Sequence, residues 1–212
     1  MTHVSSTARK AKADSNFWKK QLRQWHWISS AICLAGLLLF AVTGVTLNHA
    51  SSIEAEPKTT TRQTDLPPAL RGQLSSAVDG KPLPEALAKG IKAATGVSVA
   101  HVTPEMQDGE LSFDLAGPGV DAFLSIDLES GHATHERIER GTIAVLNDLH
   151  KGRDSGPVWA VFIDVIAIAC VLFSLTGLGL LWVHAKRRAS TWPLTGVGLA
   201  IPLILYLIFI HS

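Results

Sequence analysis

The stretch "RQWHWISSAICLAGLLLFAVTGVTLNHA", residues 23–50, contains a run without any charged residue, 28–47. An α-helix rises about 1.5 Å per residue, so roughly 20 apolar residues cross the hydrocarbon core of a bilayer. The run therefore predicts a transmembrane helix over residues 27–48. This helix also has a histidine at each end, His26 and His49, and insertion into lipid requires neither.

Two further apolar runs lie nearer the C-terminus. Residues 158–183 carry a single charge, Asp164, and residues 193–210 carry none. These runs predict transmembrane helices over 157–184 and 193–210, joined by a short loop, 185–192. The fold class expected is a membrane protein of three helices with one small soluble domain between the first two.

Basic residues near the helix ends predict the orientation, because they favour the cytoplasmic side of a membrane. They gather in the tail 1–26 and in the loop 185–192: Arg9, Lys10, Lys12, Lys19, Lys20, Arg23, Lys186, Arg187 and Arg188. We therefore expect a multi-pass protein of the bacterial inner membrane with residues 49–156 in the periplasm. The first helix is expected to be an uncleaved anchor, because its apolar run is long and no clear small-x-small site follows.

The segment 49–156 predicts a small α+β domain. Residues 50–64 are polar and Thr-rich, which indicates a linker or an irregular stretch. Leu87, Ile91 and Ala94 recur at helical spacing before Gly96, and "VSVAHVTP", residues 97–104, reads as a strand. Two further strands follow, in "GELSFDLAGPG" and in "DAFLSIDLESGHATHERIER".

His132 and His135 have the spacing of a metal-binding pair, but no third ligand is evident in the sequence. Exposed polar side chains are the favoured interpretation of this pair. The chain has no recognisable catalytic triad and no Gly-rich phosphate loop outside the membrane helices, and its net charge of +1 gives no reason to expect nucleic acid.

Four histidines at the ends of the two long helices form the candidate site. His26 and His184 fall on the expected cytoplasmic side, and His49 and His150 on the opposite side. Histidine also suits a membrane interface, but one at each end of both helices favours two facing pairs. Two imidazoles on neighbouring helices can hold an iron between them, and an apolar slot between helices suits haem. The expected cofactor is haem b, one or two per protomer.

Small and charged residues complete this candidate site. Gly44 and Gly177 would make room for a cofactor, although helix packing uses glycine equally well. Lys151 and Arg153 flank His150 and could meet haem propionates, or could be solvated loop charges.

Asp164 lies inside a membrane helix, where an unpartnered carboxylate is costly, so it is a functional candidate. It could accept the free N–H of a ligating His49, relay a proton, or pair with Arg153.

The two helix motifs resemble the PepSY-associated transmembrane-helix family. The first has His26, Thr43-Gly44 and Leu47-Asn48-His49, and the second has Leu149-His150, Gly152, Asp164 and Thr176-Gly177. The segment "AFLSIDLESGHATHERIE" is similar to the end of a PepSY module. The resemblance implies an inner-membrane haem b protein that reduces ferric iron or ferric siderophores in the periplasm, with His26, His49, His150 and His184 as ligands. It also implies that this compact version needs dimerisation or fewer haems.

The function expected is therefore a ferric reductase for iron uptake. No dinucleotide-binding motif is present outside the membrane helices, so the electron donor must be another molecule, a quinol or a cytoplasmic reductant. The alternative is a non-enzymatic PepSY module that inhibits a peptidase or serves as a scaffold for an iron transporter.

Overall fold

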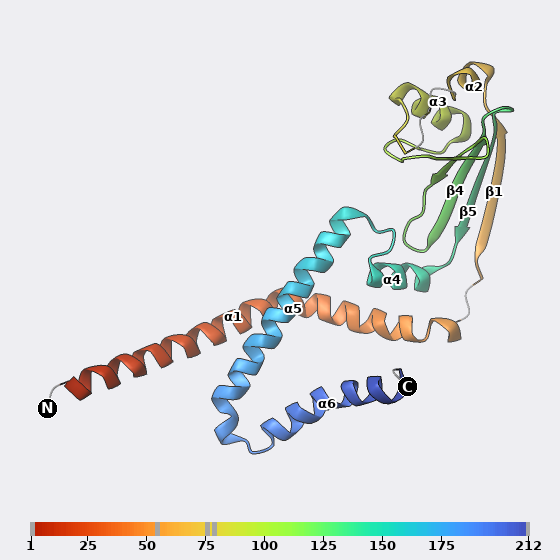
Figure 1. Ribbon diagram of the computed structural model, residues 1–212. Coiled ribbons are helices and arrows are strands. Elements are labelled where there is room, and N and C mark those ends of the chain that lie inside the picture. Colours follow the sequence, from red (N-terminus) through yellow and green to blue (C-terminus); the bar gives the residue numbers. More distant parts are fainter. Residues whose placement is uncertain (1–2, 54–55, 75–76, 78–79, 211–212) are drawn as a thin grey trace. The chain divides into compact units, whose positions relative to one another are not determined.

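The long apolar runs form three long helices in the computed structural model, which describes residues 3–53, 56–74, 77 and 80–210 (Figure 1). Their bounds are α1 (His3–Asn48), α5 (Gly156–His184) and α6 (Thr191–Phe209). Within the described residues, Asn16–Asn48 of α1 and the whole of α5 and α6 are long and apolar enough to cross a membrane. The protein is thus a multi-pass membrane protein with the three predicted helices.

α1 begins much earlier than the apolar run that predicted it. The basic tail continues the helix back to His3, because no glycine or proline interrupts residues 3–35. α5 ends at His184 and is followed by a short 3₁₀ turn, η2 (Ala185–Arg187). The chain divides into two compact units, residues 1–38 with 163–212 and residues 39–162, so α1 and α5 each contribute to both units.

The second unit contains an antiparallel sheet with the strand order β1-β5-β4-β3-β2. Its strands are β1 (Lys58–Asp65), β2 (Glu105–Gln107), β3 (Glu110–Asp114), β4 (Val120–Asp127) and β5 (His132–Glu139). α2 (Pro68–Leu74) and α3 (Glu85–Thr95) pack against one face. Along β4, Ala122, Leu124 and Ile126 are buried while Phe123 is half exposed, which is the alternation of a sheet covered on one side.

Two predictions for this domain were wrong. Residues 97–104 form no strand, because His101 has a left-handed φ of 67° that no strand can continue, and β2 begins only after Pro104. The expected linker contains β1, whose residues are exposed except for a partly buried Thr64. β1 escaped prediction because its main stabilisation is the backbone ladder to β5, which leaves no hydrophobic alternation in the sequence.

A short helix, α4 (Thr142–Lys151), connects the sheet to α5 and was not predicted. It ends at Gly152, whose left-handed φ of 70° lets its N–H close the last turn on Asp148 and Leu149. The Trp159 indole N–H donates to the Leu149 carbonyl at 2.9 Å, which fixes the start of α5 against the end of α4. α4 carries His150, so its position decides where that imidazole lies.

Candidate functional site

In the first unit, His26 of α1 binds the Thr176-Gly177 step of α5. Its Nδ1 lies 3.1 Å from Thr176 Oγ1 and 3.2 Å from the Phe173 carbonyl oxygen. The ring stacks on Phe173, with ring centroids 4.6 Å apart and an interplanar angle of 16°. A Cβ on Gly177 would come within 3.3 Å of His26 Cε1, so the glycine lets the imidazole approach the helix backbone closely.

The partners of Nδ1 identify the tautomer of His26. A carbonyl oxygen only accepts, so Nδ1 must carry the proton to bind Phe173. The single Thr176 hydroxyl proton is directed to the Leu172 carbonyl at 2.6 Å, so this oxygen accepts from His26 as well. A neutral His26 therefore presents the lone pair of Nε2, the atom that a metal ion would bind.

In the second unit, His150 of α4 repeats this arrangement on α1. Its Nδ1 lies 2.8 Å from Thr43 Oγ1, whose own proton is donated to the Leu39 carbonyl at 2.9 Å. The ring meets Phe40 edge-on, with centroids 5.3 Å apart, and a Cβ on Gly44 would be 3.4 Å from His150 Cε1. His150 therefore also donates through Nδ1 and presents Nε2.

A short internal repeat underlies both contacts. "LFAVTGVTL", residues 39–47 of α1, aligns without gaps with "LFSLTGLGL", residues 172–180 of α5, and Leu, Phe, Thr, Gly and Leu recur in register. In each copy the Phe contacts the imidazole, the Thr accepts its N–H and the Gly leaves space for its ring. Sequence reasoning found the histidines and glycines but missed the roles of Phe40, Thr43, Phe173 and Thr176, which a search for internal repeats would have shown.

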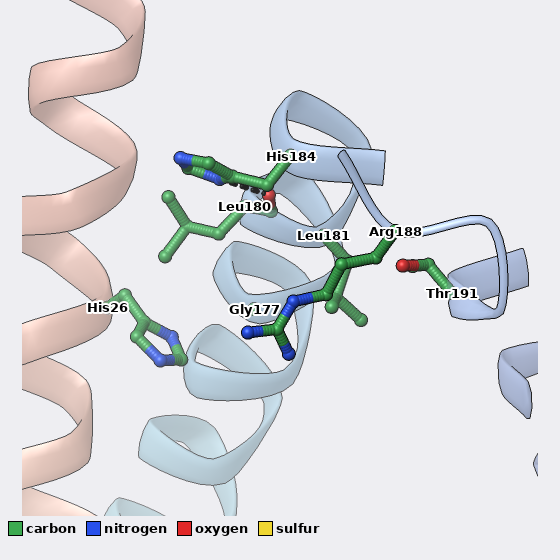
Figure 2. Close-up of a pocket in the computed structure, with 7 residues that line it drawn as sticks. All are labelled: His26, Gly177, Leu180, Leu181, His184, Arg188 and Thr191. Carbon is green, nitrogen blue, oxygen red and sulfur yellow. Dashed lines mark hydrogen bonds between the residues drawn. The ribbon is translucent and has the colours of Figure 1, made fainter. Parts of the chain in front are cut away.

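His26 and His184 line one cavity of about 570 Å³, within the usual range of roughly 300–1,000 Å³ for small-molecule sites (Figure 2). Its walls also include Leu180, Leu181, Arg188 and Thr191. His184 Nδ1 donates to the Leu180 carbonyl at 2.8 Å, and its Nε2 has no hydrogen-bond partner among the described residues. The structure thus brings together the two histidines predicted for this side and adds Arg188, a cation that sequence reasoning did not place in the site.

His49 is exposed at the end of α1 and donates from Nδ1 to the Val45 carbonyl at 3.0 Å. It shares no hydrogen bond or ring contact with His150 within the described residues. All four predicted histidines therefore bind an oxygen through Nδ1 and leave Nε2 without a hydrogen-bond partner in the described part of the chain.

A buried ion pair holds α4, and with it His150, against the sheet. The Asp148 carboxylate is 4% exposed and accepts from the Gly119 N–H at 2.9 Å and from Arg140 Nη2 at 2.7 Å. Arg140 also pairs with Asp121 at 2.9 Å. On α1, the Thr46 hydroxyl donates to the Asn147 amide oxygen at 3.1 Å. α4 is thus fixed both to the sheet and to α1.

Of the remaining predicted site residues, Lys151 and Arg153 lie beside the ion pairs that hold α4, whereas Asp164 lies apart from them. Arg153 pairs with Asp154 at 3.0 Å and with Asp121 at 3.5 Å, and Lys151 is exposed at the end of α4. Asp164 is exposed on α5, and no described residue forms a hydrogen bond or ion pair with it. The N–H that was expected to reach Asp164 from His49 is donated to Val45.

His132 and His135 both lie on β5, three positions apart, so their side chains point to opposite faces of the sheet. His132 binds Asp65 at 2.8 Å, while His135 lies beside Arg62 and Leu124. These two imidazoles do not converge on one ion. No group of three or more His, Cys, Asp or Glu side chains within the described residues is arranged to hold a metal.

Comparison with known proteins identifies the family. No curated protein and no solved structure matches the chain significantly. A family model does match, over residues 17–211, and so covers all three membrane helices and the α+β domain. The resemblance seen in the helix motifs is thereby confirmed, and the chain belongs to the family described as putative PepSY_TM-like.

Proposed function

We propose that this protein is an inner-membrane haem b protein that reduces ferric iron or ferric siderophores in the periplasm. The observation that supports this most is the common state of the four predicted ligands. His26, His49, His150 and His184 each donate from Nδ1 to a protein oxygen and present Nε2. Histidines that bind metals almost always donate their other ring N–H in this way, because that bond fixes the tautomer and raises the basicity of the ligand.

The residues of the first unit fit haem. His26 and His184 line a single cavity whose walls are otherwise mostly apolar, and Arg188 supplies a cation of the type that binds a propionate. Gly177 leaves room for the His26 ring, and the Thr176 hydroxyl holds it in place. Haem, when bound, supplies one-electron chemistry between ferric and ferrous iron, while the protein sets position, ligand basicity and water access.

The residues of the second unit would serve the periplasmic side. His150, held by Thr43, and the exposed His49 are the ligands proposed there. Lys151 and Arg153, near His150, would attract propionates or an anionic ferric complex. A carboxylate exposed to lipid is costly, so Asp164 supports association with a second copy or another membrane partner that covers it.

The direction of electron flow follows from the proposed orientation, with the basic tail in the cytoplasm. A donor on that side, a quinol or a soluble reductant, would give up electrons near His26. Each electron converts one Fe³⁺ to Fe²⁺ at the periplasmic side, so one quinol, releasing two electrons and two protons, would reduce two ferric ions.

One observation favours the non-enzymatic alternative. β1 forms an edge of the sheet and is almost wholly exposed over eight residues, so an extended peptide could pair with it. This is how a PepSY module would restrain a peptidase or bind a transporter subunit. The alternative needs no cofactor, and that difference separates the two functions.

The test is the absorption spectrum of the purified full-length protein. The proposal expects a Soret band that shifts and sharpens on reduction with dithionite. His26→Ala and His150→Ala should each remove or alter low-spin haem, whereas His101→Ala, an exposed histidine outside both sites, should not. A colourless wild-type protein from cells supplied with haem would refute the proposal and favour the peptide-binding alternative.

A further inference from the structure

The α+β domain contains a cavity of about 380 Å³ that takes no part in the contacts described above. It is lined by Arg62, Gln63, Thr64, Thr95, Leu124, Ala133 and His135. This volume lies within the usual range of roughly 300–1,000 Å³ for sites of small molecules.

The register of the strands explains why these residues meet. Arg62 of β1 lies opposite His135 of β5, which lies opposite Leu124 of β4. Directly opposite residues share a face, and Leu124 is fully buried, so this row belongs to the covered face of the sheet. The cover ends here, because Thr95 is the last residue of α3. The cavity therefore has an apolar floor, Leu124 and Ala133, and polar walls.

The charge in this cavity is unbalanced. Arg62 is exposed and has no hydrogen bond or ion pair with any described residue, and no carboxylate lines the cavity. The neighbouring Arg137 is bound to Glu139 at 3.0 Å, and the Asp65 carboxylate is bound to His132. Arg62 is thus a planar donor positioned to receive an anion, and a guanidinium matches the two oxygens of a carboxylate.

His135 adds a neutral polar group beside Arg62. Burial lowers the pKa of His135, and the charges of Arg137 and Arg62 lower it further. The imidazole is therefore neutral at neutral pH, where it can donate one hydrogen bond and accept another. The Thr95 hydroxyl is already used, since it donates to Ile91 and accepts from the Val97 N–H.

The end of α3 limits which anion fits. A helix C-terminus carries partial negative charge, so it favours a ligand that places hydroxyl donors on that side. A ligand with a carboxylate for Arg62 and a hydroxyl for His135 or the helix carbonyls meets both conditions. Hydroxycarboxylates have this pairing, and they are also chelators of ferric iron.

We propose that this cavity binds the hydroxycarboxylate portion of an iron chelator, with Arg62 holding the carboxylate and His135 the hydroxyl. The inference rests on the proposed function, because it names the chemical class of the ferric complex that the protein receives. It places recognition in the α+β domain, apart from the residues proposed to hold the cofactor.

Calorimetric titration of the full-length protein in detergent with citrate and with its redox-inert gallium(III) complex tests this proposal. Wild type should bind both. Arg62→Gln should weaken binding by about tenfold or more, because a charge-assisted hydrogen-bond pair is lost, and Arg62→Lys should fall between the two. Lys89→Gln, an exposed change on α3 outside the cavity, should bind like wild type.

Equal binding by Arg62→Gln and wild type, or no citrate binding by wild type at millimolar concentration, would overturn the proposal. The Arg62 variants should unfold at the wild-type temperature, because the side chain is exposed and unpaired among the described residues. Their haem spectrum should also be unchanged. A protein without haem that still binds citrate through Arg62 would contradict the proposed function and leave this inference standing.

Discussion

Gly36→Ala should separate α1 from α5. A Cβ at this position would lie 2.7 Å from Ile166 Cγ2, 2.9 Å from its Cδ1 and 3.0 Å from its Cγ1. Carbon atoms pack best at about 3.5–4.0 Å, so roughly 1 Å of room is missing. Ile166 is only 7% exposed, and its branched side chain has little freedom to turn away. Overpacking of this kind typically costs about 1–3 kcal/mol, which we expect for the free energy of unfolding.

The measurement is thermal unfolding in detergent, followed by tryptophan fluorescence. Gly198→Ala on α6 is the matched control, because an added Cβ there meets nothing within 4 Å. Ile166→Ala removes the atoms that Gly36→Ala would strike, so the double variant should recover part of the loss. The coupling between the two changes should be about 0.5–3 kcal/mol.

Two results would refute this reasoning. Gly36→Ala could unfold at the same temperature as Gly198→Ala, or its effect could simply add to that of Ile166→Ala. Either outcome would mean that α1 and α5 do not pack through Gly36 and Ile166 in the protein as purified.

Four further outcomes are expected. Thr176→Val removes the hydroxyl that accepts from His26, so the spectrum of bound haem should shift and its affinity fall about 10–100-fold, with the shift measured against wild type. Asp148→Asn should lower the free energy of unfolding by about 1.5–3 kcal/mol in chemical denaturation, because a buried charged hydrogen bond is lost. The pKa of His135 is lowered on folding, so its neutral form stabilises the fold above pH about 6.5 and this stabilisation is lost as the pH falls. The unfolding temperature of His135→Gln should therefore fall less than that of wild type between pH 7.5 and pH 5. Asp164→Asn should leave the haem midpoint potential unchanged, because no described residue forms a hydrogen bond or ion pair with this carboxylate, and a shifted redox titration would return Asp164 to the site.

The membrane helices were predictable because their signal is long and local. A run of about 20 predominantly apolar residues is long enough to span a bilayer, and the structure has a long apolar helix at each of the three predicted runs. β1 and α4 were missed because their positions depend on distant partners. β1 is paired to β5 mainly through its backbone, and α4 is held by Arg140, Gly119 and α1, none of which its own sequence indicates.

For the candidate site, the sequence showed which residues take part more readily than which atoms they contact. The histidines were recognised by their place at the helix ends. Thr43 and Thr176 were recognised only as motif residues, because nothing in the sequence shows that their hydroxyls accept from the imidazoles. Asp164 could support His49 only if its carboxylate accepted the hydrogen bond from the His49 ring N–H. A backbone carbonyl one helical turn away was available to His49, and such local acceptors require no tertiary arrangement.

The repeated Leu-Phe-x-x-Thr-Gly segments determine where this chain can accept inserted or deleted residues without loss of the histidine contacts. His26 is 150 positions from its acceptor Thr176, and His150 is 107 positions from Thr43. Each acceptor segment is complete within nine residues of one helix, so turns of the sheet that do not contact α4 can gain or lose residues without altering either contact. Insertions in the β2–β3 and β4–β5 turns should therefore be tolerated by the histidine sites, whereas insertions in the β3–β4 loop would displace Gly119 from Asp148 of α4. A single deletion inside either nine-residue segment would rotate its threonine away from the imidazole by about 100° of helical turn.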